Sequence, residues 1–118
     1  MSIEHVAKQF TAAIRADDAQ AYRAMWADDI VSIEPHEGEG SRTEGREALL
    51  AKHAWWEANA EMHGFTAEGP YVHGNQFALR FSMDVTMQGE RVQAVEIGLY
   101  TVRDGKIAEE RFFSDAGA

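Results

Sequence analysis

The chain has 118 residues, 45% of them hydrophobic and 26% charged, which predicts one globular domain over residues 1–118 and excludes a disordered or fibrous protein. Acidic residues number 20 against 11 basic ones, so nucleic acid and anionic membrane surfaces are not expected as partners. The absence of cysteine excludes disulfides and thiolate metal sites, and neither a membrane span nor a secretion signal is indicated, so we expect a cytoplasmic protein.

Helical periodicity marks the start of the chain. Val6, Phe10 and Ile14 recur every four residues, which predicts a first helix over residues 3–15. The next apolar face ends with Trp26, and this spacing predicts a second helix that is closed by two aspartates.

A short strand, a loop and a third helix are expected next. Residues 30–33 are β-prone, and residues 36–45 are polar and rich in glycine. A third helix is expected from Arg46 to about Met62, with His53 on its apolar stripe.

The last third of the chain changes to a period of two. One face of the strand that begins at residue 77 carries Phe77, Leu79, Phe81, Met83, Val85 and Met87. Turn signals at Gly74-Asn75, Gly89 and Asp104-Gly105 predict four consecutive antiparallel strands. Helices followed by an antiparallel sheet are typical of an α+β fold with the helices packed on one face.

Three segments occur in an order that is known from one superfamily. They are Trp26-Ala27-Asp28-Asp29 before the short strand, Gly45-Arg46-Glu47-Ala48-Leu49 at the start of a helix, and Tyr100-Thr101-Val102-Arg103-Asp104-Gly105-Lys106-Ile107 near the end. With these segments the chain resembles the NTF2-like superfamily, and within it the SnoaL-like and ketosteroid-isomerase-like branch. The resemblance implies a cone-shaped, strongly curved antiparallel sheet, also called a cystatin-like roll, wrapped around about three N-terminal helices.

The same resemblance implies an apolar pocket and homodimers that form through the outer face of the sheet. Enzymes of the superfamily include isomerases, dehydratases, polyketide cyclases and epoxide hydrolases. The fold alone therefore leaves the function open, and the residues must decide it.

Glu34 is the first candidate for chemistry. In ketosteroid-isomerase-like enzymes the general base is a carboxylate directly before a proline, and Glu34-Pro35 matches that position. Burial at the mouth of an apolar pocket moves the pKa of such a carboxyl towards working pH. The alternative is a solvated carboxylate at the end of a strand.

The oxyanion donors of that mechanism are missing from this sequence. The family's tyrosine on the first helix maps to Phe10, and its aspartic acid on a late strand maps approximately to Gly98. Losing one such donor costs about 2.7–4 kcal/mol of transition-state stabilisation, so we do not expect a steroid isomerase of the standard type.

Glu96 and His53 are further catalytic candidates. Glu96 shares one face of its strand with Gly98 and Tyr100, the face that the resemblance turns towards the pocket. The opposite face is the more apolar one, with Val95, Ile97 and Leu99, so periodicity alone leaves open which face is inside. His53 is either a hydrogen-bonded core residue or an acid–base group.

The pocket is expected to be lined by Phe10, Trp26, Trp56, Phe81, Met83, Gly98, Tyr100 and Phe112. No two histidines have metal-ligand spacing, so neither a metal nor an organic cofactor is expected. Two functions remain open: a cofactor-independent isomerase, dehydratase or cyclase acting on a small apolar or weakly polar molecule, or a non-catalytic ligand-binding or dimerisation module.

Overall fold

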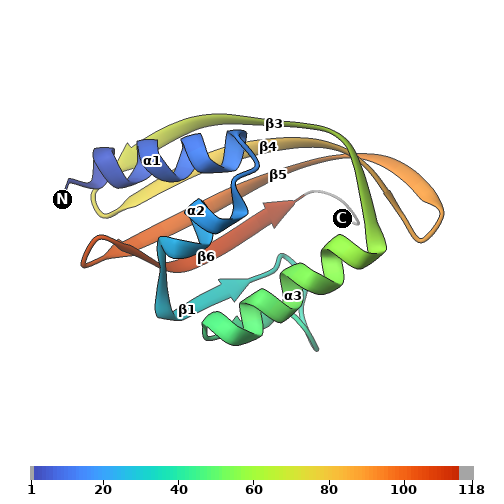
Figure 1. Ribbon diagram of the computed structural model, residues 1–118, viewed down its shortest axis with the longest axis horizontal. Helices are drawn as coiled ribbons and strands as arrows, with labels where there is room; N and C mark the ends of the chain where they lie inside the picture. Colours follow the sequence, from blue (N-terminus) through green and yellow to red (C-terminus); the bar gives the residue numbers. More distant parts are fainter. Residues whose placement is uncertain (1, 115–118) are drawn as a thin grey trace.

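The fold is a curved six-stranded mixed sheet with three helices, as seen in the computed structural model, which describes residues 2–114 (Figure 1). The elements in chain order are α1 (Ile3–Arg15), α2 (Ala19–Ala24), β1 (Trp26–Ile33), β2 (Arg42–Glu44), α3 (Arg46–Asn59), β3 (Ala60–His73), β4 (Gln76–Met87), β5 (Glu90–Arg103) and β6 (Lys106–Ser114). The strand order is β2-β1-β6-β5-β4-β3. Figure 1 shows the long strands β3, β4 and β5 arching over the helices, which confirms the expected α+β fold.

The first helix forms where its periodicity predicts it. The Ser2 side chain caps α1 by accepting a hydrogen bond from the backbone N–H of His5 at 3.1 Å. Val6 and Phe10 are almost fully buried where α1 packs against β3 and β4. An amphipathic helix with a capped start therefore needs no long-range information to be recognised.

The second helix is shorter than its sequence pattern predicts. It ends at Ala24, and Trp26 is the first residue of β1. The backbone N–H of Ile107 donates to the Met25 carbonyl at 2.8 Å, which aligns Trp26 with β6. This parallel pairing across the sheet overrides the helical spacing, and the prediction that Trp26 lies on a helix is wrong.

The third helix starts as expected but ends earlier, at Asn59, because Ala60 already pairs with Met87 on β4. Leu49 is the only fully buried residue described in α3, while Trp55 and Trp56 are 54% and 38% exposed. The helix packs on β1 and β2 through this narrow face.

The four strands β3 to β6 are antiparallel, as predicted, and β1 adds to β6 in parallel, which makes the sheet mixed. The hairpin turn between β5 and β6 contains Asp104 and Gly105, both with positive φ, as a tight two-residue turn requires. The long strand β3 has register shifts after Met62 and after Glu68, and these shifts break the alternation that would reveal it in the sequence.

The inner face of β5 is the one that carries Glu96. Gly98 and Tyr100 on this face are buried, whereas Val95 and Ile97 on the other face are 37% and 43% exposed. The orientation implied by the family resemblance is therefore confirmed, and hydrophobicity alone would have selected the wrong face. No helix within residues 2–114 is long and apolar enough to cross a membrane.

Candidate functional site: a carboxylate cluster beneath the third helix

A group of charged and polar side chains gathers between α3 and the inner face of the sheet. We call Glu34, Glu96, Glu110, Lys52 and Ser32 the carboxylate cluster. Ser32 and Glu110 are register partners on β1 and β6, and Glu110 pairs in turn with Tyr100 on β5. Residues opposite each other on neighbouring strands share a face, so these side chains form a row across the sheet.

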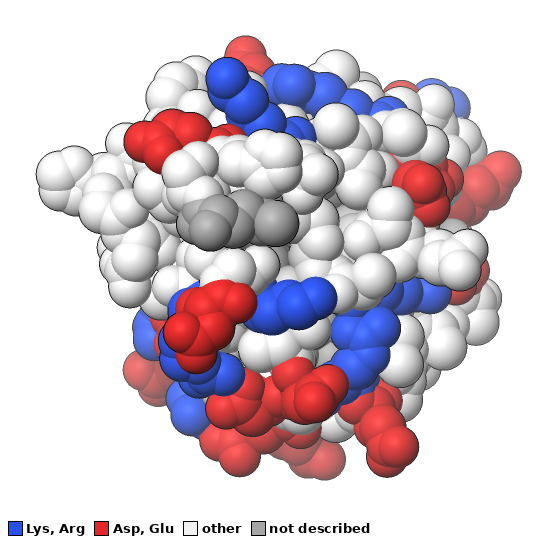
Figure 2. All heavy atoms as spheres, turned by 60° about the vertical axis from the view of Figure 1, so that its left-hand side comes forward, with Lys and Arg blue, Asp and Glu red and all other residues white. Residues whose placement is uncertain are grey.

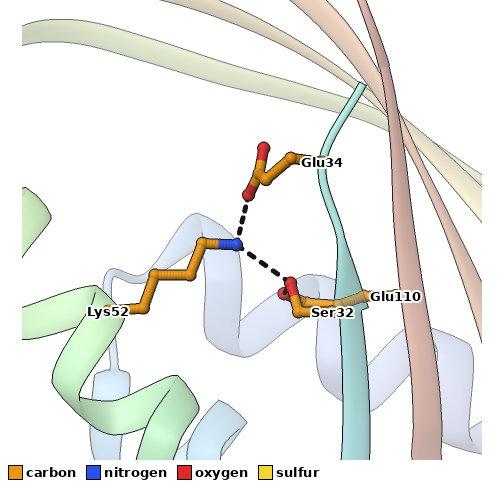
Figure 3. Close-up of polar contacts among 4 residues, drawn as sticks. All are labelled: Ser32, Glu34, Lys52 and Glu110. Atoms are coloured by element: carbon orange, nitrogen blue, oxygen red, sulfur yellow. Dashed lines mark hydrogen bonds and ion pairs between the residues drawn. The ribbon is translucent and has the colours of Figure 1, made fainter. Parts of the chain in front are cut away.

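Lys52 connects two members of this cluster. Its Nζ donates to Glu34 Oε1 in an ion pair and to Ser32 Oγ at 3.1 Å (Figure 3). The Lys52 and Glu34 side chains are only 29% and 24% exposed. The Lys52 ammonium also lies 5.9 Å from the centre of the Phe112 ring. The helix α3 thus supplies the cation, and the sheet and the end of β1 supply its partners.

Glu110 is the most deeply buried carboxyl group of the cluster. It is 5% exposed, and the Ser32 hydroxyl donates to its Oε2 at 2.7 Å. Burial raises the pKa of Glu110 to about 7, although the Ser32 hydrogen bond and the Lys52 charge act in the opposite direction. In the sequence Glu110 lies in the charged run Glu109-Glu110-Arg111, which by itself favours a solvated strand position, but in the structure its side chain is buried.

Glu96 is half-buried on β5, opposite Phe81 of β4. Burial, followed by the negative charge of Glu34, raises its pKa to about 7, against the effect of Lys52. A carboxyl group with this pKa is present in both protonation states near neutral pH. It can therefore accept and return a proton.

His53, the residue after Lys52, lies among aromatic rings. Its ring centroid is 5.1 Å from that of Trp26 and 6.3 Å from that of Tyr22. Burial, reinforced by the charges of Arg23 and Lys52, lowers the pKa of His53 to about 4. The imidazole is therefore neutral at pH 7, as expected of a histidine packed in a core.

Most of the side chains that were predicted to line a pocket pack against one another in the core. Phe10, Trp26, Phe81, Gly98 and Tyr100 are buried, Met83 and Phe112 are half-buried, and Trp56 is 38% exposed. The Tyr100 ring centroid lies 4.9 Å from that of Phe10 and stacks at 5.0 Å on that of Phe77. An apolar pocket at this place stays a prediction.

A surface hollow of about 390 Å³ lies elsewhere, at the start of β1 beside the β5–β6 turn. Trp26 is the one predicted pocket residue that lines this hollow. The hollow is also lined by charged side chains, among them Asp28, Arg46, Arg103 and Lys106. Figure 2 shows this side of the molecule, and acidic and basic side chains are intermingled in the lower part of the view. The hollow thus has charges of both signs and is separate from the carboxylate cluster.

An apolar surface borders Glu96 towards the β4–β5 turn. Met62, Phe65 and Val92 are 43%, 38% and 40% exposed. Phe65 pairs with Met83, and both Met62 and Val92 pair with Val85, which is buried on the inner face. These side chains therefore face the same side of the sheet as Glu96 and are available for contact with an apolar molecule.

The sequence model of the SnoaL-like domain family matches residues 1–114. The chain belongs to the SnoaL-like domain family. A crystallised protein of Mesorhizobium loti, provisionally named a SnoaL-like polyketide cyclase, is 50% identical, with a TM-score of 0.92 and coverage of 96% of this chain and 99% of that one. No curated protein matches the sequence.

Two more distant solved structures share the fold of this SnoaL-like domain. An NTF2-like protein of Burkholderia pseudomallei is 16% identical, with a TM-score of 0.79 and coverage of 98% and 92% of the two chains. A protein of Catenulispora acidiphila with a ketosteroid-isomerase-like fold, solved with trimethylamine, is 18% identical, with a TM-score of 0.71 and coverage of 92% and 83%. At these identities the likeness shows the fold alone.

Three members of the site of this SnoaL-like domain are not predicted by the sequence: Ser32, Lys52 and Glu110. Lys52 follows Leu49 at a helical spacing of three, which places it near the buried face of α3. This spacing is the only local feature of the sequence that could have indicated Lys52 as a member of the site. Ser32 and Glu110 have no such local feature, because they come together only through the parallel pairing of β1 and β6. Within residues 2–114, no group of three or more His, Asp and Glu side chains is arranged to hold a metal ion.

Proposed function

We propose that this SnoaL-like domain catalyses proton transfer on a small apolar or weakly polar carbonyl compound, with Glu96 as the group that takes up and returns the proton. One observation carries the proposal. Glu96 lies on the inner face of the sheet beside exposed apolar side chains, and its pKa is raised to about 7. Efficient general acid–base catalysis needs a group with a pKa near the working pH.

The chemistry follows from this placement. The Glu96 carboxylate removes a proton from the carbon next to a carbonyl group, and the electrons of the broken C–H bond form the C=C bond of an enolate, whose oxygen takes up the negative charge. In an isomerisation, protonated Glu96 returns the proton to another carbon. In a cyclisation, the enolate carbon attacks a second carbonyl of the same molecule, and the proton goes to the alkoxide that forms.

Glu34 has a different role in this proposal from the one suggested by its position before Pro35. Its carboxylate is ion-paired with Lys52, so one of its oxygens is already occupied. We assign it to holding the Lys52 ammonium near Glu96 and the reacting molecule. A fixed positive charge in a partly buried site favours the negative charge that develops on the enolate.

The resemblance to the Mesorhizobium protein, which is named for cyclisation, supports the same class of chemistry. The alternative is a domain that binds a small molecule without changing it. That alternative is favoured by the tight packing of Phe10, Phe77 and Tyr100 in the core.

Exchange of carbon-bound protons tests the proposal without knowledge of the natural substrate. We expect the protein to accelerate the incorporation of deuterium from D₂O into 2-tetralone, measured by ¹H NMR at pH 7. Glu96→Gln should reduce the rate to that of buffer, while Glu90→Gln, at an exposed site on the same strand, should not change it. A wild-type rate equal to that of buffer would support the non-catalytic alternative.

We also propose that two copies associate through the outer face of the sheet. Val95, Ile97 and Phe113 on this face are 37%, 43% and 48% exposed. Ile97 and Phe113 are register partners on β5 and β6, so their side chains form one apolar patch. Association of this patch with its copy would remove it from water.

A further inference from the structure

Gly98 and Tyr100 have an unusually close relationship on the inner face of β5. A Cβ atom at Gly98 would lie 2.9 Å from the Tyr100 hydroxyl oxygen and 3.1 Å from Cε2 of Phe81. A Cβ atom does not approach other heavy atoms this closely unless they are displaced. Because Gly98 has no side chain, the Tyr100 hydroxyl can extend into the space beside it.

This arrangement directs the hydroxyl towards Glu96. The Cα atoms of Glu96 and Tyr100 are four residues apart on an extended strand, which is about 13 Å. Because the Tyr100 oxygen reaches the position of Gly98, it lies roughly half-way along this stretch, on the same face as the Glu96 side chain.

The tyrosine is held in place by its ring. Tyr100 is 2% exposed, and its ring stacks on Phe77 and meets the edge of Phe112 at 6.4 Å between centroids. Its hydroxyl has no hydrogen-bond acceptor within the described part of the chain, residues 2–114. Burial raises the pKa of the Tyr100 phenol, so the hydroxyl keeps its proton and can donate it to an acceptor.

We infer that the Tyr100 hydroxyl is the hydrogen-bond donor that receives the carbonyl oxygen of the molecule whose proton Glu96 transfers. The inference rests on the proposed function, since it supplies the donor for the enolate oxygen of that reaction. The donors expected by family resemblance are absent at Phe10 and Gly98, and the Gly98 gap is the place that Tyr100 fills. A donor aimed at the developing negative charge stabilises the transition state more than the ground state.

Two variants test the Tyr100 donor. Tyr100→Phe removes one oxygen and keeps the ring contacts, so the fold should be retained. Deuterium exchange into 2-tetralone should fall about 100-fold with little change in KM. Gly98→Ala, which places a carbon 2.9 Å from the hydroxyl oxygen and so displaces the hydroxyl, should also reduce exchange. Tyr71→Phe, at a position that is 64% exposed, is the control and should leave the rate unchanged.

Binding of 2-naphthol, which offers an aromatic body and one oxygen, separates this inference from the proposed function. Fluorescence titration should show roughly tenfold weaker binding to Tyr100→Phe than to wild type. If Glu96→Gln stops exchange and Tyr100→Phe exchanges like wild type, the inference is overturned and the proposed function stands. If wild type catalyses no exchange but Tyr100→Phe still weakens 2-naphthol binding, the proposed function fails and the donor is supported. Equal affinity of wild type and Tyr100→Phe for 2-naphthol would overturn the inference that the Tyr100 hydroxyl is the donor.

Discussion

Ser32 and Glu110 lie 78 residues apart in the sequence, yet the Ser32 hydroxyl donates a hydrogen bond of 2.7 Å to Glu110 Oε2 in the interior of the protein. Lys52 Nζ donates to the same serine oxygen at 3.1 Å. A buried carboxyl group is thus joined, through one hydroxyl, to the cation that pairs with Glu34 (Figure 3). This connection makes the protonation of Glu110 part of the electrostatics of the whole cluster.

Glu110 should make the stability of the protein depend on pH. Its folded-state pKa of about 7 is above the unfolded value, so the folded protein binds this proton more tightly than the unfolded chain does. The stabilising contribution is fully present below about pH 4.3 and is lost as the pH rises through 7, which amounts to roughly 3 kcal/mol.

Urea unfolding of wild type and Glu110→Gln between pH 4.5 and 8 measures this contribution. The free energy of unfolding of wild type, minus that of the variant, should decrease by roughly 3 kcal/mol across this range. The control Glu109→Gln should follow wild type at every pH. A difference that does not change with pH would contradict the raised pKa of Glu110.

Lys52→Met should raise the pKa values of both Glu96 and Glu110. The Lys52 charge lowers these two pKa values in the wild-type protein. Its removal leaves burial and the Glu34 carboxylate unopposed at Glu96, whereas at Glu110 the Ser32 hydrogen bond still opposes them. The rising limb of the exchange rate against pH should move to higher pH with Glu96. Lys8→Met on the exposed face of α1 is the matched control, and an unmoved limb in Lys52→Met would refute the coupling.

Leu49→Ala should destabilise the protein by about 2–5 kcal/mol, because it leaves a cavity where a fully buried side chain stood. Leu49 is the buried anchor of α3 among the described residues, and α3 carries Lys52. The substitution should therefore also weaken the Lys52–Glu34 pair. Thermal unfolding and the ¹⁵N NMR signal of the Lys52 side chain test both effects, with Ala48→Gly at an exposed site of the same helix as the comparison.

Ile97→Lys should convert a dimer into a monomer, since it places a charge in the centre of the outer apolar patch. Its side chain points away from the core, so the fold should be unaffected. Sedimentation velocity at several concentrations distinguishes the two states. Arg80→Lys, opposite Ile97 on β4, keeps the charge and should remain dimeric. If the wild-type protein sediments as a monomer, the proposed dimer interface is wrong.

Local patterns in the sequence were sufficient to predict α1, the buried face of β4 and the hairpin turns. Each depends on residues that are close in sequence: Val6 and Phe10 share a helix face, and Asp104-Gly105 closes a two-residue turn. The irregular strand β3 has no such pattern. Trp26 had the spacing of a helix, and only its pairing with Ile107 shows that it starts a strand.

The carboxylate cluster could be predicted only in part. Glu96 was predicted as a candidate, but only the family resemblance indicated that it faces inwards. Hydrophobic periodicity favours the opposite face of β5 as the inner one, because that face carries the apolar residues Val95 and Ile97. Glu110 could not be found, since its burial depends on the position of β6 between β1 and β5. A carboxylate in a charged segment is usually solvated, and only the tertiary structure shows that this one is not.

The protonation of Glu96 is the central claim, and a ¹³C NMR titration of the glutamate side-chain carboxyl carbons measures it directly, with Glu96→Gln to assign the signal. We predict a midpoint near pH 7 for Glu96, as its burial beside Glu34 requires. A midpoint near the reference value of about 4.3 would contradict the proposed role, because Glu96 would then be an ordinary ionised carboxylate and a weaker base than one with a pKa near 7.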